Sequence, residues 1–488
     1  MRARSASLEA PAPLELAHPG AELAFEEAGS SLPSLLILAY RFPPQARVGS
    51  HRTTKFVKYL GRYGWRPIVH TVSNPYSPHL DPTLSLQIPD DVLVFRTPTV
   101  ELEGLETRLG WARDLWRGSR AIESPRATLT NGSSSDLPAR LRDHAWRYWF
   151  VPDPQIPWVP AAFVRSLWIA KRHRPSAIYS TSPPHSVQLA ALGLKRWLDL
   201  PWIADLRDPW TEGMHRRRWY EHNDARRRRE ERWEGAVCRS ADRVLVATEG
   251  ARETLCRKYP DTAHKITCIT NGFDVDDFVR LTPERRFFSR DRLHVMLAGQ
   301  VESQFDLLPL FRAIHELVSR SPRARVLQLH FVGTRRRPEC DAFLALHGLE
   351  DVVLFHEPVQ HPICLQMLSE SDAGLIAAAE RQRSRGIKIS SKLYEYLYLR
   401  KPVLALIEAG VTTRILERAR LGLHAPPDDH GAITAHLEAL VDQFHDGGIR
   451  VDPDEAYIEG FDRRRQAQTL ATILDEVVQP RRAYARPS

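Results

Sequence analysis

The residues best suited to chemistry stand together in the segment Ser390-Ser391-Lys392-Leu393-Tyr394-Glu395-Tyr396-Leu397. Ser390 or Ser391 is a good cap for the first turn of a helix. The free N–H groups and partial positive charge of a helix start suit a phosphate, and Lys388 and Lys392 would add positive charge beside it. Glu395, one turn further, could accept hydrogen bonds from a ribose diol. The same pattern also fits an ordinary amphipathic helix with its apolar residues packed inward.

Other polar residues directly follow apolar runs that predict buried strands. In open parallel sheets, ligands bind at the loops beyond the carboxyl ends of the strands. The loops in question are Arg41–Ser50, Thr181–Ser186 and Arg207–Trp210 in the first half, and Gly299–Gln300, Gly333–Thr334 and Ala379–Ile389 in the second. The adjacent Arg207 and Asp208 could be a local salt bridge, or could orient an acceptor hydroxyl with Asp208 as its base. Their placement favours the second interpretation.

Strand and helix patterns alternate along the chain, as they do in a doubly wound parallel sheet. Strands are predicted over 35–40, 67–72, 92–95, 177–180, 202–205 and 243–248, and again over 293–298, 326–332, 352–355, 373–378 and 403–407. Helices are predicted over 53–63, 187–198, 307–318, 391–399 and 463–477. The break near 280–290 separates two successive sets. The sequence therefore predicts an α/β protein of two facing Rossmann-like domains, with helices on both faces of each sheet.

These patterns divide the chain into segments. We expect a disordered tail over 1–33, a first Rossmann-like domain over 34–285 with a flexible insertion at about 116–138, and a second Rossmann-like domain over 286–460. A helix over 461–478 would cross back, before a tail over 479–488.

Composition excludes several classes of protein. The chain has 488 residues, 43% hydrophobic and 26% charged, which is typical of a globular protein and not of a disordered or fibrous one. Its five cysteines are widely spaced and form no C-x-x-C pair, so neither a disulfide framework nor a zinc site is indicated. No apolar run is long enough to span a membrane. We expect a cytoplasmic protein, with peripheral contact at the inner face of the membrane left open.

The net charge of +8 permits anionic partners without selecting one. Arginine runs at 216–218 and 226–229 are interleaved with acidic residues, which favours a solvated helix with internal ion pairs. An alternative is a patch for anionic lipid, to which the aromatic residues of segment 140–150 could contribute. The acidic neighbours, and the lack of a recognisable module, argue against nucleic acid.

The segment 391–397, with Lys401-Pro402-Val403-Leu404-Ala405 after it, resembles the donor-site helix of family 4 glycosyltransferases of GT-B fold. Further matches follow in the family's order. They are Phe42-Pro43-Pro44 with Gly49, Ser182-Pro183-Pro184, Asp205 to Trp210, Ala241 to Val244, Thr270 to Asp274, Phe331-Val332-Gly333 and Ser371 to Gly374. The resemblance covers roughly residues 34–478. Each motif is weak alone, and their joint order is what carries the resemblance.

This resemblance implies transfer of a sugar from a nucleotide-diphosphate donor to a glycan or lipid-linked acceptor, with retention and without a metal or other cofactor, as in polysaccharide biosynthesis. Stabilising the charge of the leaving diphosphate would be the main catalytic contribution. It implies a donor site formed by Gly49, Asn271, Gly299, Gln300, Gly333, Lys388, Ser391, Lys392 and Glu395. Catalysis would involve Asp208, His185 and Lys388, and the acceptor would meet Thr181 and Arg207.

The chain departs from the family pattern at two positions. Many members carry a glutamate eight residues before the one at 395, where this chain has Ile387. Many also carry a histidine where this chain has Thr181, and here His185 follows four residues later. These departures motivate a second hypothesis, a catalytically silent GT-B relative that binds nucleotides or acts as a scaffold. A nucleotide-sugar epimerase is a third, but the sequence shows no clear pair of acid and base carboxylates for it.

Overall fold

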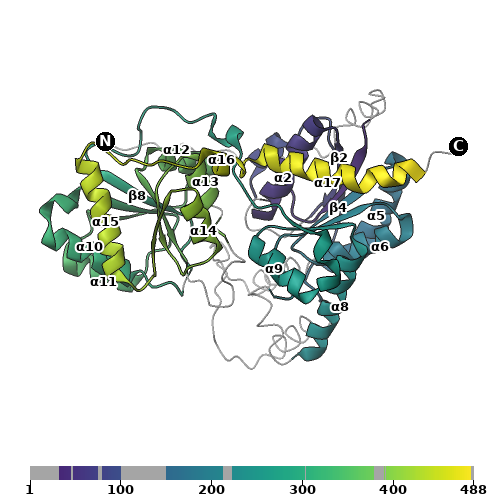
Figure 1. Cartoon of the computed structure of the whole chain (residues 1–488), viewed down its shortest axis with the longest axis horizontal. Helices are drawn as coiled ribbons and strands as arrows, with labels where there is room; N and C mark the ends of the chain where they lie inside the picture. Colours follow the sequence, from purple (N-terminus) through teal and green to yellow (C-terminus); the bar gives the residue numbers. More distant parts are fainter. Residues whose placement is uncertain are drawn as a thin grey trace, which may run out of the picture.

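A computed structural model gives the structure of the chain. It describes residues 32–45, 48–74, 80–100, 150–212, 223–302, 304–378, 389–390 and 392–484. The described residues form two α/β domains that lie side by side (Figure 1). Each domain contains one parallel sheet, which confirms the predicted fold class.

The first domain is built on a seven-stranded sheet in the order β3-β2-β1-β4-β5-β6-β7. Its strands are β1 (Ser34–Ala39), β2 (Arg66–Val72), β3 (Leu93–Thr97), β4 (Ala177–Ser182), β5 (Trp202–Leu206), β6 (Arg243–Val246) and β7 (Ile266–Cys268). Both β1 and β4 are completely buried, because helices cover the two faces. Such strands appear in the sequence as continuous apolar runs, which is why they could be predicted.

Helices cover each face of this sheet as a separate layer. One layer contains α5 (Trp158–His173), α6 (Ser186–Leu198), α8 (Asp224–Ser240) and α9 (Glu249–Lys258), and packs on residues such as Leu36, Ile178 and Ala204. The other contains α2 (Val48–Leu60) and α17 (Arg463–Tyr484), and packs on Leu35, Tyr179 and Ile203. Neighbouring residues of one strand thus serve opposite cores, as the alternation of side chains along a strand requires.

The second domain has a six-stranded sheet in the order β10-β9-β8-β11-β12-β13. Its strands are β8 (Leu293–Ala298), β9 (Leu327–Val332), β10 (Val353–His356), β11 (Ala373–Ala377), β12 (Val403–Leu406) and β13 (Gly422–Ala425). One face packs against α10 (Leu308–Arg320), α11 (Pro338–His347) and α15 (His430–His445). The other packs against α12 (His361–Glu370), α13 (Lys392–Tyr398), α14 (Val411–Arg418) and α16 (Glu455–Glu459).

The chain crosses between the domains twice, and the two crossings lie side by side. Phe273 on the first pairs with Asp462 on the second, and the N–H of Arg463 donates to the Phe273 carbonyl at 2.9 Å. A side chain at Gly272 would overlap the Phe461 carbonyl oxygen, so the close approach of the crossings requires glycine there. After the second crossing, α17 lies against α2 of the first domain (Figure 1).

The largest differences from the predicted element boundaries lie in the first and last helices. Gly49 was expected in a loop, but α2 already begins at Val48 and places Gly49 in its first turn. The last helix was expected to end at 478, but α17 continues to Tyr484. The predicted insertion at 116–138 and the tail 1–33, except residues 32–33, lie outside the described residues.

Candidate active site

The ends of β8 and β9 bring three of the predicted donor residues together. Gly299 follows β8 and Gly333 follows β9, with φ values of +110° and +81° that favour glycine. The side-chain N–H₂ of Gln300 donates to the Gly333 carbonyl, and the Thr334 hydroxyl donates to the Gly299 carbonyl at 2.6 Å. These bonds hold the two loops against each other at the carboxyl edge of the second sheet.

Lys392 and Glu395 form an ion pair at the start of α13. The Lys392 Nζ atom lies 2.9 Å from a Glu395 oxygen. Burial alone would lower the pKa of Lys392, but the Glu395 carboxylate outweighs burial and raises it, so the ammonium stays charged. The predicted residues Lys388 and Ser391 lie outside the described part of the chain.

Packing of Tyr396 fixes the helix that carries this pair. Its hydroxyl donates to the Met296 carbonyl of β8 at 2.8 Å. Its ring lies over Gly374 of β11, where a Cβ would stand 2.7 Å from the ring. The glycine therefore lets α13 rest close to the sheet and sets the position of Lys392.

Two histidines that the sequence reasoning missed face each other across the domains. His51 comes from α2 of the first domain and His361 from the start of α12 in the second, with ring centroids 6.3 Å apart. Burial, His361, Lys55, Arg463 and Lys392 together lower the pKa of His51 to about 4. Burial also lowers the pKa of His361, which feels both Lys392 and Glu395. The charge of Lys392 thus acts on α2 of the facing domain.

Asp205, near the carboxyl end of β5, is the centre of a buried polar network. Its carboxylate accepts from Arg52 Nε at 3.0 Å, from the Tyr179 hydroxyl at 2.5 Å and from the Thr181 hydroxyl at 3.2 Å. Arg52 also donates to the carbonyls of Ile269 and Thr270, both at 2.8 Å. Burial would lower the pKa of Arg52, but Asp205 and Tyr179 outweigh it and raise that pKa. Thr181, predicted to meet the acceptor, is thus buried and part of this network.

Arg207 lies directly against Gly49. Its Nε donates to the Ser182 carbonyl at 2.9 Å and its Nη2 to the Pro183 carbonyl at 2.8 Å. A side chain at position 49 would overlap the guanidinium, so this arginine is by itself a packing reason for glycine. Burial lowers the pKa of Arg207. The next residue, Asp208, is exposed. The structure thus brings Gly49, Arg207 and Asp208 to one edge of the first sheet.

His185 and Asn271 are held by packing and by the domain crossing. The His185 ring is 3% exposed and stacks on Trp210, with centroids 5.0 Å apart. Trp210 in turn donates from its backbone to Glu234 and from its indole to Glu230. The Asn271 side-chain oxygen accepts from Arg463 Nη2 at 3.4 Å. The catalytic role of His185 and the donor-binding role of Asn271 remain predictions.

No local sequence pattern marks the site residues that were not predicted, which are His51, His361 and Arg52. His51 and His361 are single histidines in helical segments, and nothing nearby sets them apart from surface residues. Arg52 stands 153 residues from Asp205, so their contact depends on the folded sheet. Only the placement of Asp205 at the end of a predicted strand drew attention to that segment.

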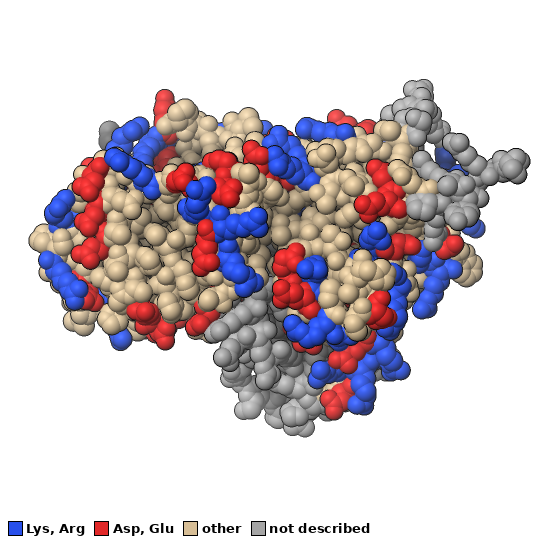
Figure 2. All heavy atoms as spheres, in the orientation of Figure 1, with Lys and Arg blue, Asp and Glu red and all other residues tan. Residues whose placement is uncertain are grey.

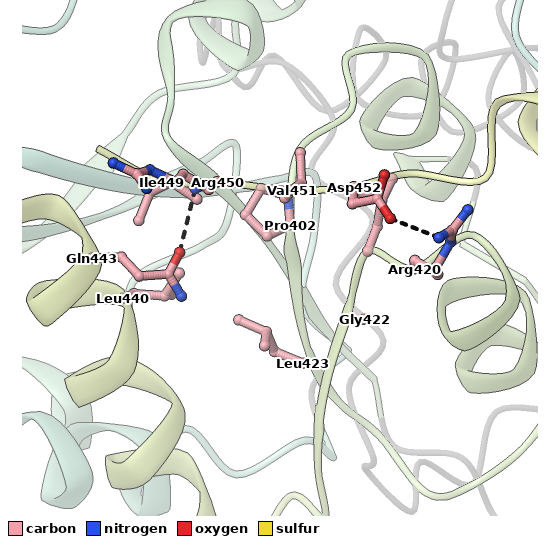
Figure 3. Close-up of a pocket in the computed structure, with 11 residues that line it drawn as sticks. Pro402, Arg420, Gly422, Leu423, Leu440, Gln443, Ile449, Arg450, Val451 and Asp452 are labelled. Carbon is pink, nitrogen blue, oxygen red and sulfur yellow. Dashed lines mark hydrogen bonds and ion pairs between the residues drawn. The ribbon is translucent and has the colours of Figure 1, made fainter. Parts of the chain in front are cut away.

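A cavity of about 240 Å³ lies elsewhere, beside β13 and α15 (Figure 3). Its lining includes Leu423, Leu440 and Ile449, with the Arg420–Asp452 ion pair at 2.6 Å near one end. No predicted site residue lines it. Within the described ranges, no group of three or more His, Cys, Asp and Glu residues is placed to hold a metal ion, and no helix is long and apolar enough to cross a membrane.

Comparisons with known proteins agree with the fold. Residues 127–277 match the model of Glycosyltransferase Family 4. A glycosyltransferase from Rickettsia africae is 14% identical with a TM-score of 0.55, covering 92% of this chain and all of its own. A candidate UDP-N-acetylglucosamine 2-epimerase from Listeria monocytogenes is 12% identical with a TM-score of 0.51, covering 92% of this chain and 98% of its own. No curated protein sequence matches significantly. The chain therefore has the GT-B fold of two facing parallel-sheet domains, and residues 127–277 carry the match to Glycosyltransferase Family 4.

Proposed function

We propose that this protein is a hexosyltransferase-type glycosyltransferase that moves a sugar from a nucleotide-diphosphate sugar to a glycan or lipid-linked acceptor. The family match and the GT-B fold support the class of reaction. The observation that carries the proposal is the place of Lys392. It lies at the start of α13 and is held there by the ion pair with Glu395.

In this proposal the second domain holds the donor. Lys392, with Lys388, neutralises the diphosphate, while Glu395 accepts hydrogen bonds from the ribose. The loops at Gly299–Gln300 and Gly333 let their backbone approach the nucleotide sugar, because their glycines have no Cβ at the cleft edge. His51 of α2 and His361 of α12 lie beside this site, and Lys55 and Arg463 of the first domain are close enough to lower the pKa of His51, so a bound diphosphate would meet cationic groups from both domains.

The reaction breaks the bond between the anomeric carbon and the diphosphate oxygen, and forms one from that carbon to an acceptor hydroxyl. The departing diphosphate gains negative charge, which fixed cations stabilise most strongly in a site that excludes water. Exposed Asp208 could accept the hydroxyl proton, next to Arg207 on the acceptor side. We further propose retention of configuration, no need for a metal ion, and a cytoplasmic enzyme of polysaccharide biosynthesis at the inner membrane face.

A panel of nucleotide sugars, each incubated with the protein and candidate acceptors, tests this function. Mass spectrometry should detect transfer from one donor, and Lys392→Ala should reduce the rate by two to three orders of magnitude, about the effect of removing one charge-stabilising group. Lys265→Ala is the control, because Lys265 precedes β7 at the opposite edge of the first sheet. Nucleotide binding without turnover would support the silent relative instead, and transfer that is indifferent to Lys392 would contradict the proposed site.

A further inference from the structure

The helix layer α5, α6 and α8 exposes large apolar side chains on its outer surface. Val164 and Trp168, one turn apart on α5, are 66% and 43% exposed, and Trp197 of α6 is 71% exposed. The two helices cross closely there, because a Cβ at Gly193 would stand 3.1 Å from the Phe163 ring. Trp197 packs edge-on against Phe163, with centroids 6.4 Å apart, so its exposed ring is held in place.

The same surface is basic. Neither α5 nor α6 contains an aspartate or glutamate, and together they carry Arg165, Lys171, Arg172, Lys195 and Arg196. The Arg165 guanidinium lies 4.1 Å from the centre of the Trp168 ring. Lys195 is mostly buried and pairs with Asp242 at 2.9 Å, so the exposed positive charge comes from the other four, and Asp199 at the end of α6 is an exposed acidic neighbour.

Helix α8 continues the basic surface beside α6. Its Arg227, Arg228 and Arg232 are exposed, while its Glu230 and Glu234 are completely buried. Glu230 pairs with the buried Arg226, and Glu234 pairs with Lys258. The arginine run 226–229 is therefore not one continuous patch, since its first member is buried. Figure 2 shows Lys and Arg side chains along the edge of the molecule where α8 lies, with some acidic groups among them.

We propose that the outer surface formed by Val164, Trp168, Lys171, Arg196 and Trp197, here named the basic-aromatic face, docks onto a membrane surface of anionic lipid. Charge complementarity selects this occupant, because the exposed side chains of α5 and α6 are apolar or predominantly cationic. Tryptophan suits the boundary between headgroups and acyl chains. Each nearby lysine or arginine adds attraction to anionic headgroups. This docking rests on the proposed location at the inner membrane face and deepens it by naming the surface, but it does not require the transferase activity.

Sedimentation with vesicles tests the docking with the full chain. The wild-type protein should bind vesicles of phosphatidylcholine with about one third phosphatidylglycerol, and should bind poorly to phosphatidylcholine alone or at high salt. The variant Lys171→Gln/Arg196→Gln/Trp197→Ser should lose at least about tenfold in partitioning, because it removes two charges and one interfacial ring. Circular dichroism and thermal melting would check that this variant is folded.

The matched control is Leu346→Ser/Arg312→Gln, which changes exposed residues of the same kinds in the second domain. It should bind vesicles as the wild type does. Equal binding by the triple variant, loss of binding in the control, or no binding of anionic vesicles by the wild type would overturn the proposal. Self-association that the triple variant abolishes, without vesicle binding, would make the face a contact between copies and overturn it too. Lys392→Ala should still bind vesicles, because Lys392 lies outside this face. A failure of the proposed activity can therefore be distinguished from a failure of the docking.

Discussion

At the scale of single residues, the site edge depends on contacts between the first helix and distant strand ends. Arg52 and Asp205 form a completely buried ion pair, and Arg207 fills the space beside Gly49. Such contacts are costly to disturb, because a buried charge that loses its partner is not solvated again. The local sequence placed Lys392 and Glu395 in one helical turn and singled both out, although their ion pair was not predicted. It could not predict the pairs that folding brings together from different strands and helices.

Replacing Gly49 by alanine should destabilise the protein by about 1–3 kcal/mol, because the Arg207 guanidinium is buried, hydrogen-bonded and cannot move freely. Chemical denaturation would measure the change in unfolding free energy. Gly61→Ala is the control, because a Cβ there meets nothing within 4 Å. In an Arg207→Ala background, Gly49→Ala should reduce the unfolding free energy by less. An equal cost in both backgrounds would show that the contact is not the cause.

At the scale of elements, strands with continuous apolar runs were predicted, including the edge strands β3 and β10, whereas β7, β13 and several helices were not. Strand β7 has only three residues, and β13 includes a glycine and a histidine, so neither forms a continuous apolar run. Helix α5 was also missed, because Val164 and Trp168 are apolar residues on its exposed side and weaken its amphipathic pattern. The start of α2 was misplaced, since Gly49 and Ser50 are weak helix formers. Tertiary contacts of the helix with Arg207 and Asp205 override that local preference.

Helix α17 should stabilise the first domain although it comes last in the chain. Leu470 is completely buried against α2, so Leu470→Ala should cost about 2–5 kcal/mol. Hydrogen exchange should then increase in α2 and leave α10 of the second domain unchanged. The variant Gln468→Ala, on the exposed side of α17, should change neither. Faster exchange in the second domain alone would contradict this assignment of the helix.

At the scale of the whole molecule, the two domains bring polar and charged groups together where α2 meets α12 and α13. His51 and His361 meet there, with Lys55 and Arg463 from one side and Lys392 and Glu395 from the other. Asp277 also lies near His361. Two facing Rossmann-like domains could be predicted from the repeated strand–helix order. This cluster of groups could not, because its members come from segments that only the domain arrangement brings together.

Binding of a nucleoside diphosphate should take up protons, because the anion would raise the pKa of His51 from its value of about 4. The complex then holds more protons than the free protein, so affinity should weaken as pH rises above about 4, the pKa of His51 in the free protein. Titration calorimetry at pH 6 in MES and in Bis-Tris, which differ in ionisation enthalpy, should reveal this uptake. His51→Gln should reduce it, whereas the exposed His430→Gln should not. Equal heats in both buffers would contradict the role of the histidines.

The central claim is that the start of α13 binds the diphosphate of a nucleotide, and calorimetric titration with UDP and GDP tests it most directly. The account predicts binding of at least one of them at a single site, lost in Lys392→Ala and retained in Lys265→Ala. Absence of binding by both nucleotides, or equal binding by the wild type and Lys392→Ala, would contradict it.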